Sequence, residues 1–329
     1  MSGLGQKASG RLLDPVSLAI FGVAAVLPLI IRQQYWQGVL VVALYYAIMA
    51  VAWNLLAGFA GQFTLAPAAF SLLGAYTSGV LNFHYGISPA VGIPAGVVVA
   101  GLTGLLLGRI ALRMRGPYVS LTSVAFLFII NIVISNAYSI TRGDLDLQVP
   151  GLFNLSRVGY YYVFLAALFL VQLIVYQLLK SRIGLFIQAV RDDELAAASR
   201  GVDVTRWKTV VFGISSAMCG LAGGLYVHFI RLASPEIGTI LQSGLVVTMV
   251  VVGGMATLAG PLIGAFLIQV ASEGLRAIGM QHMLVFSLLV ILTVRFFPSG
   301  LWGFVDQVMR RSRLAAAASA APVKGRVRT

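Results

Sequence analysis

The sequence predicts an all-α membrane protein, a polytopic bundle of about eight to ten transmembrane helices. Composition is the first observation behind this class. Of the 329 residues, 59% are apolar and 10% are charged, against about 25% charged in a typical soluble domain. Mean hydropathy is +0.93. The apolar residues also gather in long runs, and the basic residues fall in the gaps between them. A soluble fold of this size could not bury so much apolar surface.

Apolar runs long enough to cross a bilayer recur along the whole chain. A span needs about 20 apolar residues, and helices are expected because barrel strands would alternate over about ten residues. The run at 261–273 would reach only about 20 Å as a helix, so we expect a half-helix there, covered by protein or lining a water-filled cavity. The ten predicted runs are 16–31, 38–57, 63–81, 87–108, 118–138, 159–179, 209–230, 240–256, 261–273 and 283–298.

The basic residues predict the orientation of this bundle. With the N-terminus in the cytoplasm, seventeen Lys and Arg fall on the inner side and five on the outer side, in agreement with the positive-inside rule. An even number of spans, eight or ten, keeps the basic tail inside, so both termini are predicted to be cytoplasmic. The five outer residues are Arg32, Arg142, Arg157, Arg231 and Arg276.

The same pattern divides the chain into three parts. Residues 1–15 form a short basic segment, 16–304 hold the apolar runs, and 305–329 are a basic, Ala-rich tail of low complexity. The first run resembles the core of a signal peptide, but no small-residue cleavage site follows it, so we expect an uncleaved anchor. We expect the tail to be disordered and near anionic lipid.

The longest polar interval between the runs, 180–208, is predicted to fold. Apolar residues recur at three- and four-residue steps between 183 and 190, which indicates an amphipathic helix. Gly201 is placed to end a helix, and a second helix is expected to begin near Val204. Connections between helices usually need only about 2–8 residues. Either the charges of 180–208 only set the topology, or the segment is a docking surface for a cytoplasmic partner.

Other functional classes fit this sequence poorly. A net charge of +13 could indicate nucleic-acid binding, but the basic residues form no patch on a soluble fold. Cys219 stands alone and the three histidines are scattered, so we expect neither a metal site nor a catalytic triad, and no enzyme. No lysine follows a glycine, so the chain lacks the Gly-Lys-[Ser/Thr] element of a P-loop and binds no cofactor of its own.

Energy for transport must then come from a partner or from an ion gradient. Secondary transporters often place ionisable residues inside their spans. Here the acidic residues lie near the ends of the runs, which argues against proton coupling. Sodium coupling through backbone carbonyls and a channel stay open as alternatives.

Several stretches resemble one family of transport proteins. The segment 180–208 resembles the ATPase-contacting loop of ATP-binding-cassette (ABC) importer permeases, and is closest to the branched-chain amino acid permeases of the LivM type. The stretch 54–62 resembles that family's N-L-L-x-G-[YF]-A-G-Q signature. Two departures, at Ala66-Pro67 and at 141–143, put the identity of the substrate in doubt. The other matching stretches are 68–76, 112–118, 251–265 and 297–303.

The resemblance implies a division of labour. Such a permease subunit pairs with a second, LivH-type permease, receives amino acid from a periplasmic binding protein, and is driven by two cytoplasmic ATPases that hydrolyse the ATP. It implies the bacterial inner membrane, with branched-chain or related amino acids as cargo and another solute such as urea as the alternative. The ATPase-docking residues it implies are Arg191, Asp192, Glu194, Ala197, Gly201, Thr205, Arg206 and Lys208.

Polar residues and glycines inside the spans are candidates for the substrate path. Their side chains could hydrogen-bond a zwitterion, or they could instead bond across helices within the protein. Gly58 and Gly61 are expected to interrupt a helix, because transporters commonly bind substrate at the free backbone groups of such breaks. The path candidates are Asn54, Gly58, Gly61, Gln62, Thr64, Thr122, Ser123 and Asn131.

Overall fold

The computed structural model describes residues 15–111, 118–152, 155–276, 291, 295 and 300–303. Residues 1–14 of the predicted N-terminal segment, the tail 305–329 and most of the last apolar run lie outside the described residues. Within them the protein is almost entirely helical. The long helices are α1 (Pro15–Ile30), α2 (Gln34–Trp53), α3 (Pro67–Tyr85), α4 (Pro89–Ala111), α5 (Tyr118–Asn136), α7 (Arg157–Lys180), α10 (Val204–Ile230), α11 (Ile240–Gly253) and α12 (Gly260–Leu275).

Short elements connect these helices. A π-helix, η1, continues α2, and two-residue strands pair antiparallel, Leu147 with Ala233 and Gln148 with Leu232. The short elements are η1 (Asn54–Phe59), α6 (Tyr138–Thr141), η2 (Gly143–Leu145), β1 (Leu147–Gln148), α8 (Arg182–Asp192), α9 (Glu194–Ser199), β2 (Leu232–Ala233) and η3 (Pro235–Gly238).

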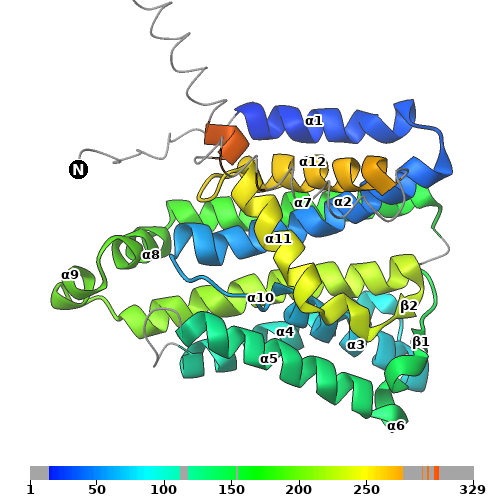
Figure 1. The fold of residues 1–329 in the computed structure, drawn as a ribbon, viewed down its shortest axis with the longest axis horizontal. Coiled ribbons are helices and arrows are strands. Elements are labelled where there is room, and N and C mark those ends of the chain that lie inside the picture. Colours follow the sequence, from blue (N-terminus) through cyan, green and yellow to red (C-terminus); the bar gives the residue numbers. More distant parts are fainter. Residues whose placement is uncertain are drawn as a thin grey trace, which may run out of the picture.

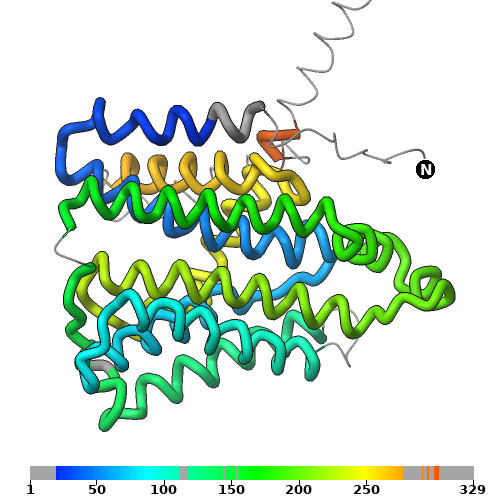
Figure 2. Tube along the Cα trace, turned by 180° about the vertical axis from the view of Figure 1, so that it is seen from behind, coloured from blue at the N-terminus to red at the C-terminus, as the bar shows by residue number. Residues whose placement is uncertain are grey.

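The helices form two groups that run roughly side by side (Figure 1). One group holds α1, α2, α7 and α12, the other holds α3, α4, α5 and α10, and α11 crosses obliquely between them. The view from behind shows α8 and α9 projecting at one end, opposite the connection between α1 and α2 (Figure 2). We call these ends the α8–α9 end and the β1–β2 end.

Nine of the ten predicted apolar runs form helices in the structure. The tenth lies almost entirely outside the described residues. Five helices in the described part are long and apolar enough to cross a membrane. The run 240–256 is wrong as a full span, since α11 has 14 residues and reaches only about 21 Å. The predicted half-helix, α12, has 16 residues and is about 24 Å long. Both are shorter than the bilayer core of about 30 Å.

Glycines bring α3, α4 and α10 into close backbone contact. A Cβ atom added at Gly74 of α3 would overlap the backbone of Gly220 on α10, and one at Gly96 of α4 would lie 2.6 Å from the carbonyl oxygen of Gly74. A side chain at either position would push the helices apart. These glycines therefore allow the close helix–helix packing of the α3–α4–α10 seam.

A buried histidine fastens the loop at the β1–β2 end to α10. His228 is fully buried, with Nε2 2.7 Å from Ser78 Oγ and Nδ1 2.9 Å from the carbonyl oxygen of Pro150. A carbonyl only accepts, so Nδ1 carries the proton and Nε2 accepts from the Ser78 hydroxyl. The Tyr160 hydroxyl donates to the His228 carbonyl at 3.0 Å. These bonds give His228 a structural role.

The basic residues separate between the two ends. All the described basic residues of the predicted inner group lie at the α8–α9 end. The five residues of the predicted outer group lie at the β1–β2 end. The residues at the α8–α9 end are Arg109, Lys180, Arg182, Arg191, Arg200, Arg206 and Lys208.

Candidate functional site

The segment 180–208 folds as α8, α9 and the first turn of α10, close to the sequence prediction. On α8, Ile187 and Val190 are buried against the bundle, as the apolar periodicity predicts. Phe186 stacks on Trp207 of α10 with ring centroids 5.5 Å apart. Gly201 has φ +81°, a conformation that favours glycine, and α10 begins at Val204.

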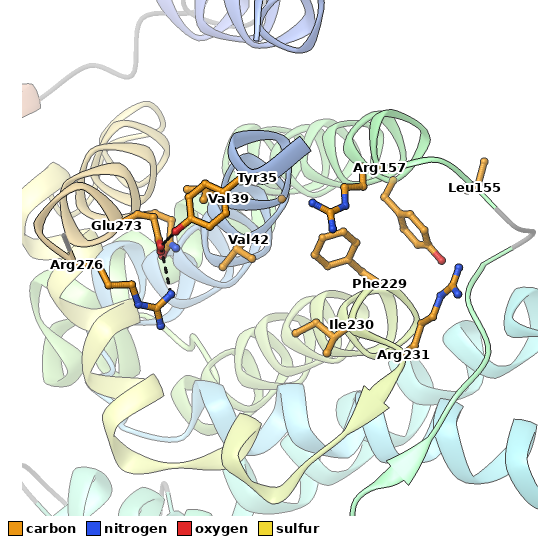
Figure 3. Close-up of a pocket in the computed structure, with 13 residues that line it drawn as sticks. Tyr35, Val39, Val42, Leu155, Arg157, Phe229, Ile230, Arg231, Glu273 and Arg276 are labelled. Carbon is orange, nitrogen blue, oxygen red and sulfur yellow. Dashed lines mark hydrogen bonds and ion pairs between the residues drawn. The ribbon is translucent and has the colours of Figure 1, made fainter. Parts of the chain in front are cut away.

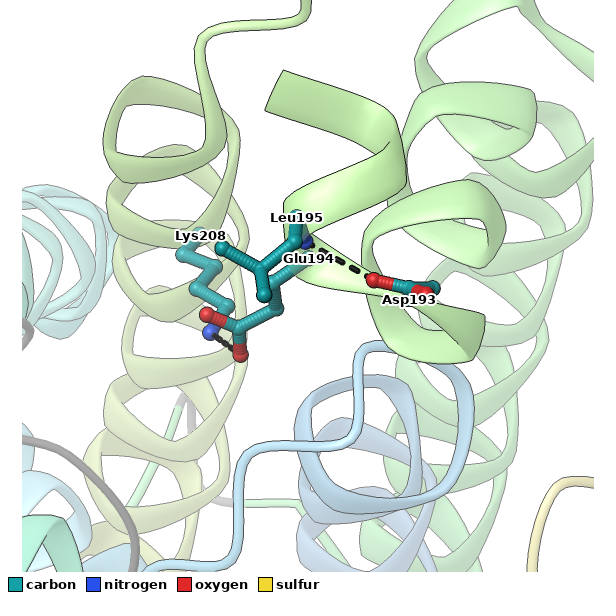
Figure 4. Close-up of polar contacts among 4 residues, drawn as sticks. All are labelled: Asp193, Glu194, Leu195 and Lys208. Carbon is teal, nitrogen blue, oxygen red and sulfur yellow. Dashed lines mark hydrogen bonds and ion pairs between the residues drawn. The ribbon is translucent and has the colours of Figure 1, made fainter. Parts of the chain in front are cut away.

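Aspartates begin both later helices of this segment. Asp193 caps α9 by accepting from the backbone N–H groups of Leu195 at 2.9 Å and Ala196 at 3.0 Å (Figure 4). Asp203 caps α10 through the N–H of Arg206. An ion pair between Glu194 and Lys208 then ties α9 to α10. Capping and pairing hold α9, of which the sequence predicted only the stop at Gly201, in a fixed position.

The predicted docking residues divide between the surface and the interior. Ala197 is buried, and the Lys208 side chain, which pairs with Glu194, is only 14% exposed. Leu195, missed by the sequence reasoning, is 79% exposed on α9. Leu185 on α8 is also 66% exposed, so the loop presents two exposed apolar side chains together with its charged ones. The predicted residues that are exposed are Arg191, Asp192, Glu194, Gly201, Thr205 and Arg206.

The helix interruption expected at Gly58 and Gly61 is present. The α2 helix widens into η1, where the Ala60 N–H donates to the Leu55 carbonyl at 3.2 Å, and Gly61 then takes φ +68°. Irregular backbone follows until Pro67 begins α3. The predicted helix start at residue 63 is therefore wrong by four residues, because Pro67 at the first helical position fixes the start.

Asn54 holds the interruption against the loop between α11 and α12. Its Oδ1 accepts from the Ala256 N–H and its Nδ2 donates to the Thr257 carbonyl, both at 2.8 Å. Gly58 packs against the same side chain, and a Cβ added at Gly58 would lie 2.8 Å from Ala256 N. Asn54 is 2% exposed. Asn54 thus binds the chain's own backbone, and Gly58 gives the room for that contact.

Gly61 contacts α8 directly. A Cβ added at Gly61 would lie 3.1 Å from Cγ of Arg191, so the stem of that side chain rests on the glycine. Arg191 itself is exposed, which leaves its guanidinium at the surface. The structure therefore joins two features that the sequence treated separately, the docking loop and the interrupted helix.

Serines of α5 satisfy the irregular backbone before α3. Ser123 Oγ accepts from the Leu65 N–H at 2.8 Å, and Ser120 Oγ donates to the Phe63 carbonyl at 3.0 Å. The Thr64 carbonyl accepts from Trp53 Nε1 at 2.7 Å. Non-helical backbone at membrane depth needs such internal partners.

The remaining path candidates do not converge on one place. Thr122 bonds the Tyr118 carbonyl of its own helix. Asn131 donates to the Pro235 carbonyl at 2.8 Å, far along α5 toward the β1–β2 end. Gln62 differs from both, since it is 4% exposed and neither polar atom of its side chain has a hydrogen-bond partner in the described residues.

A cavity of about 520 Å³ opens at the β1–β2 end between α2, α7, α10 and α12 (Figure 3). Glu273 pairs with Arg276 at 3.2 Å and accepts from the Tyr35 hydroxyl. The Glu273 carboxylate raises the pKa of Arg276 above its ordinary value. Arg157 donates to the Gln34 carbonyl at 2.7 Å. Within the described residues, no three His, Cys, Asp or Glu side chains are placed to hold a metal ion.

Comparisons with known proteins agree with this architecture. Residues 35–294 match the family described as branched-chain amino acid transport system, permease component. The chain is 31% identical to the high-affinity branched-chain amino acid transport system permease protein LivM of Salmonella typhimurium, over 78% of this chain and 67% of that protein. It is 26% identical to LivH of Escherichia coli, over 82% and 95% of the two chains.

A sugar permease is also similar. The fructose import permease protein FrcC of Rhizobium meliloti is 29% identical over 70% of this chain and 68% of its own. No solved structure matches. The family match covers most of the chain, including η1 and the α8–α9 loop. The protein therefore belongs to the branched-chain amino acid transport system permease family, and is a multi-pass membrane transport protein rather than an enzyme.

Proposed function

We propose that this chain is one of two permease subunits of an ATP-driven importer that carries branched-chain or related amino acids. The observation that carries the proposal is the folded, capped α8–α9 loop at the end of the molecule that holds most of the described basic residues. Family membership supports it. In this proposal the α8–α9 end and both termini are cytoplasmic, and the β1–β2 end faces the periplasm of a bacterial inner membrane.

The partners follow from this assignment. Two cytoplasmic ATPases hydrolyse ATP, one of them against the α8–α9 loop, while a LivH-type permease completes the path and a binding protein delivers cargo at the β1–β2 end. The exposed surface of the loop offers Leu195 as an apolar anchor and Arg191, Asp192 and Arg206 as charged groups. This composition suits a docking site. Arg191 would pass movement of the ATPase to the interrupted helix through Gly61.

Gln62 is the predicted path residue that best suits a contact with cargo. Its amide is buried without a partner among the described residues, and it follows the positive-φ glycine directly. Such an amide gains two hydrogen bonds if a polar solute passes it. We propose it as a path contact near the cytoplasmic side.

A sugar is the second candidate cargo. The similarity to FrcC, a fructose import permease, favours it specifically. The same subunit arrangement would then serve a neutral solute.

Co-purification tests the docking assignment. Leu195 and Leu145 are 79% and 76% exposed at opposite ends of the molecule. We expect Leu195→Asp to abolish recovery of the ATPases with the tagged permease, because a desolvated carboxylate would replace an apolar anchor. Leu145→Asp should leave recovery unchanged. Equal recovery with both variants would contradict the docking assignment.

A further inference from the structure

A second cavity, of about 470 Å³, is lined by residues of α2, α10, β2, η3 and α11 and so lies at the β1–β2 end. We call it the tyrosine cavity. Its volume falls within the range of small-molecule sites, about 300–1,000 Å³. The residues that matter below are Tyr45, Tyr46, Tyr226, Gln242, Asp146 and Glu236.

Aromatic rings form the wall of this cavity. Tyr45 and Tyr226 stack with ring centroids 4.1 Å apart, and Tyr46 lies against Tyr45 at 5.0 Å. Tyr45 reaches inward, where its hydroxyl is 2.9 Å from Ser71 Oγ on α3. The Tyr46 hydroxyl donates to Gln242 Oε1, which leaves the Gln242 amide group as a donor. The wall is thus rigid, apolar on its faces and polar at its edges.

Two carboxylates line the same cavity without cationic partners. The described residues offer Asp146 and Glu236 no ion pair, and no side-chain hydrogen bond is formed by either carboxylate. In the neighbouring cavity, Glu273 is already neutralised by Arg276. Asp146 is half-buried and Glu236 is exposed, so the rim of the cavity carries two negative charges that a cationic group can approach.

We propose that the tyrosine cavity binds the primary ammonium group of a small solute. Asp146 and Glu236 provide the charge, and the tyrosine faces add cation–π attraction. The proposal rests on the proposed function and narrows its cargo to solutes that bear an amino group. A neutral sugar gains hydrogen bonds at such a site but leaves the two charges uncompensated.

Charge-selective thiol labelling tests the site directly. Cys219 is buried, so a Ser234→Cys variant places one reactive thiol at the tyrosine cavity, which Ser234 lines. The purified variant is treated with a trimethylammonium or a sulfonate methanethiosulfonate. The quantity compared is the rate of labelling by the cationic reagent divided by the rate with the anionic one. We expect this ratio to be at least about tenfold higher for the Ser234→Cys variant than for a free thiol in solution. Adding Asp146→Asn and Glu236→Gln should remove that preference, whereas adding Glu273→Gln should not.

Protection identifies the solute class. L-Leucine and 3-methylbutylamine at millimolar concentration should slow labelling, while ribose and 4-methylpentanoate should not. The proposal would be overturned if ribose alone protects or if none of the four compounds protects. It would also be overturned if the preference for the cationic reagent survives Asp146→Asn with Glu236→Gln. The labelling needs no ATPase or binding protein. If the complex imports leucine but leucine does not slow labelling of the Ser234→Cys variant, only the proposed site is refuted. If leucine slows labelling but the complex does not import it, only the importer assignment is refuted.

Discussion

Asn54 uses both ends of its amide to hold η1 against the loop between α11 and α12. In a transmembrane protein, an interrupted helix leaves backbone groups that the chain must satisfy internally. Asn54, Ser120 and Ser123 all serve that need here. Polar residues near the interruption therefore stabilise the irregular backbone.

Replacing Asn54 by Ala should destabilise the protein by about 1–3 kcal/mol, because the Ala256 N–H and the Thr257 carbonyl lose their partners. A thiol-reactive dye can follow thermal unfolding, since the thiol of Cys219 is buried in the folded protein. Asn136→Ala is the control, because Asn136 is exposed and bonds only the Ile132 carbonyl of its own helix. Equal midpoints for the two variants would contradict the role given to Asn54.

Sequence reasoning identified the polar residues of the spans but could not separate path residues from structural ones. Asn54, Ser123 and Asn131 have the chemistry that a zwitterion requires, and each uses it on backbone of this chain instead. The two roles need the same residue types, so only the fold distinguishes them. Gln62, whose amide lacks partners in the described residues, stays a prediction for the path.

At the scale of elements, the seam between α3, α4 and α10 depends on glycine. Gly74→Ala should force α3 away from the Gly220 backbone and destabilise the protein by about 1–3 kcal/mol. Gly244→Ala on α11 is the matched control, because nothing lies within 4 Å of its Cβ position. Thermal unfolding of both variants checks this, and a similar midpoint for both would show that the seam tolerates wider spacing.

The ion pair between α9 and α10 makes a separate prediction. Glu194→Lys places like charges together and should displace α9, which would weaken recovery of the ATPases. The exchange Glu194→Lys with Lys208→Glu restores an opposite-charge pair and should restore most of the recovery. If the exchange is as poor as the single change, Glu194 contacts the ATPase itself rather than positioning α9.

Element boundaries followed the sequence where local signals were strong. Gly201 and the apolar periodicity of 183–190 predicted the helix stop and α8 correctly. The π-helix and the β1–β2 pair were not predicted, because their cause is not local. Leu147 and Ala233 pair across distant parts of the chain, and two-residue strands carry no periodicity.

The whole molecule has a charge polarity that matches its proposed orientation. Basic residues of the predicted inner and outer groups lie at opposite ends in the described part of the chain. The sequence predicted this separation because the positive-inside rule acts on short loops. It could not predict that Arg191 would rest on Gly61, because the two lie on segments far apart in the sequence.

Transport across proteoliposome membranes tests the central claim most directly. The vesicles contain this permease with a LivH-type subunit and ATPases whose nucleotide sites face outward, and the binding protein is enclosed. Labelled L-leucine is enclosed together with the binding protein, and its appearance in the outer medium, on the side of the ATPases, is followed. We predict transfer that requires both ATP and loaded binding protein. Transfer driven by a proton or sodium gradient without ATP would contradict the account and identify a secondary transporter.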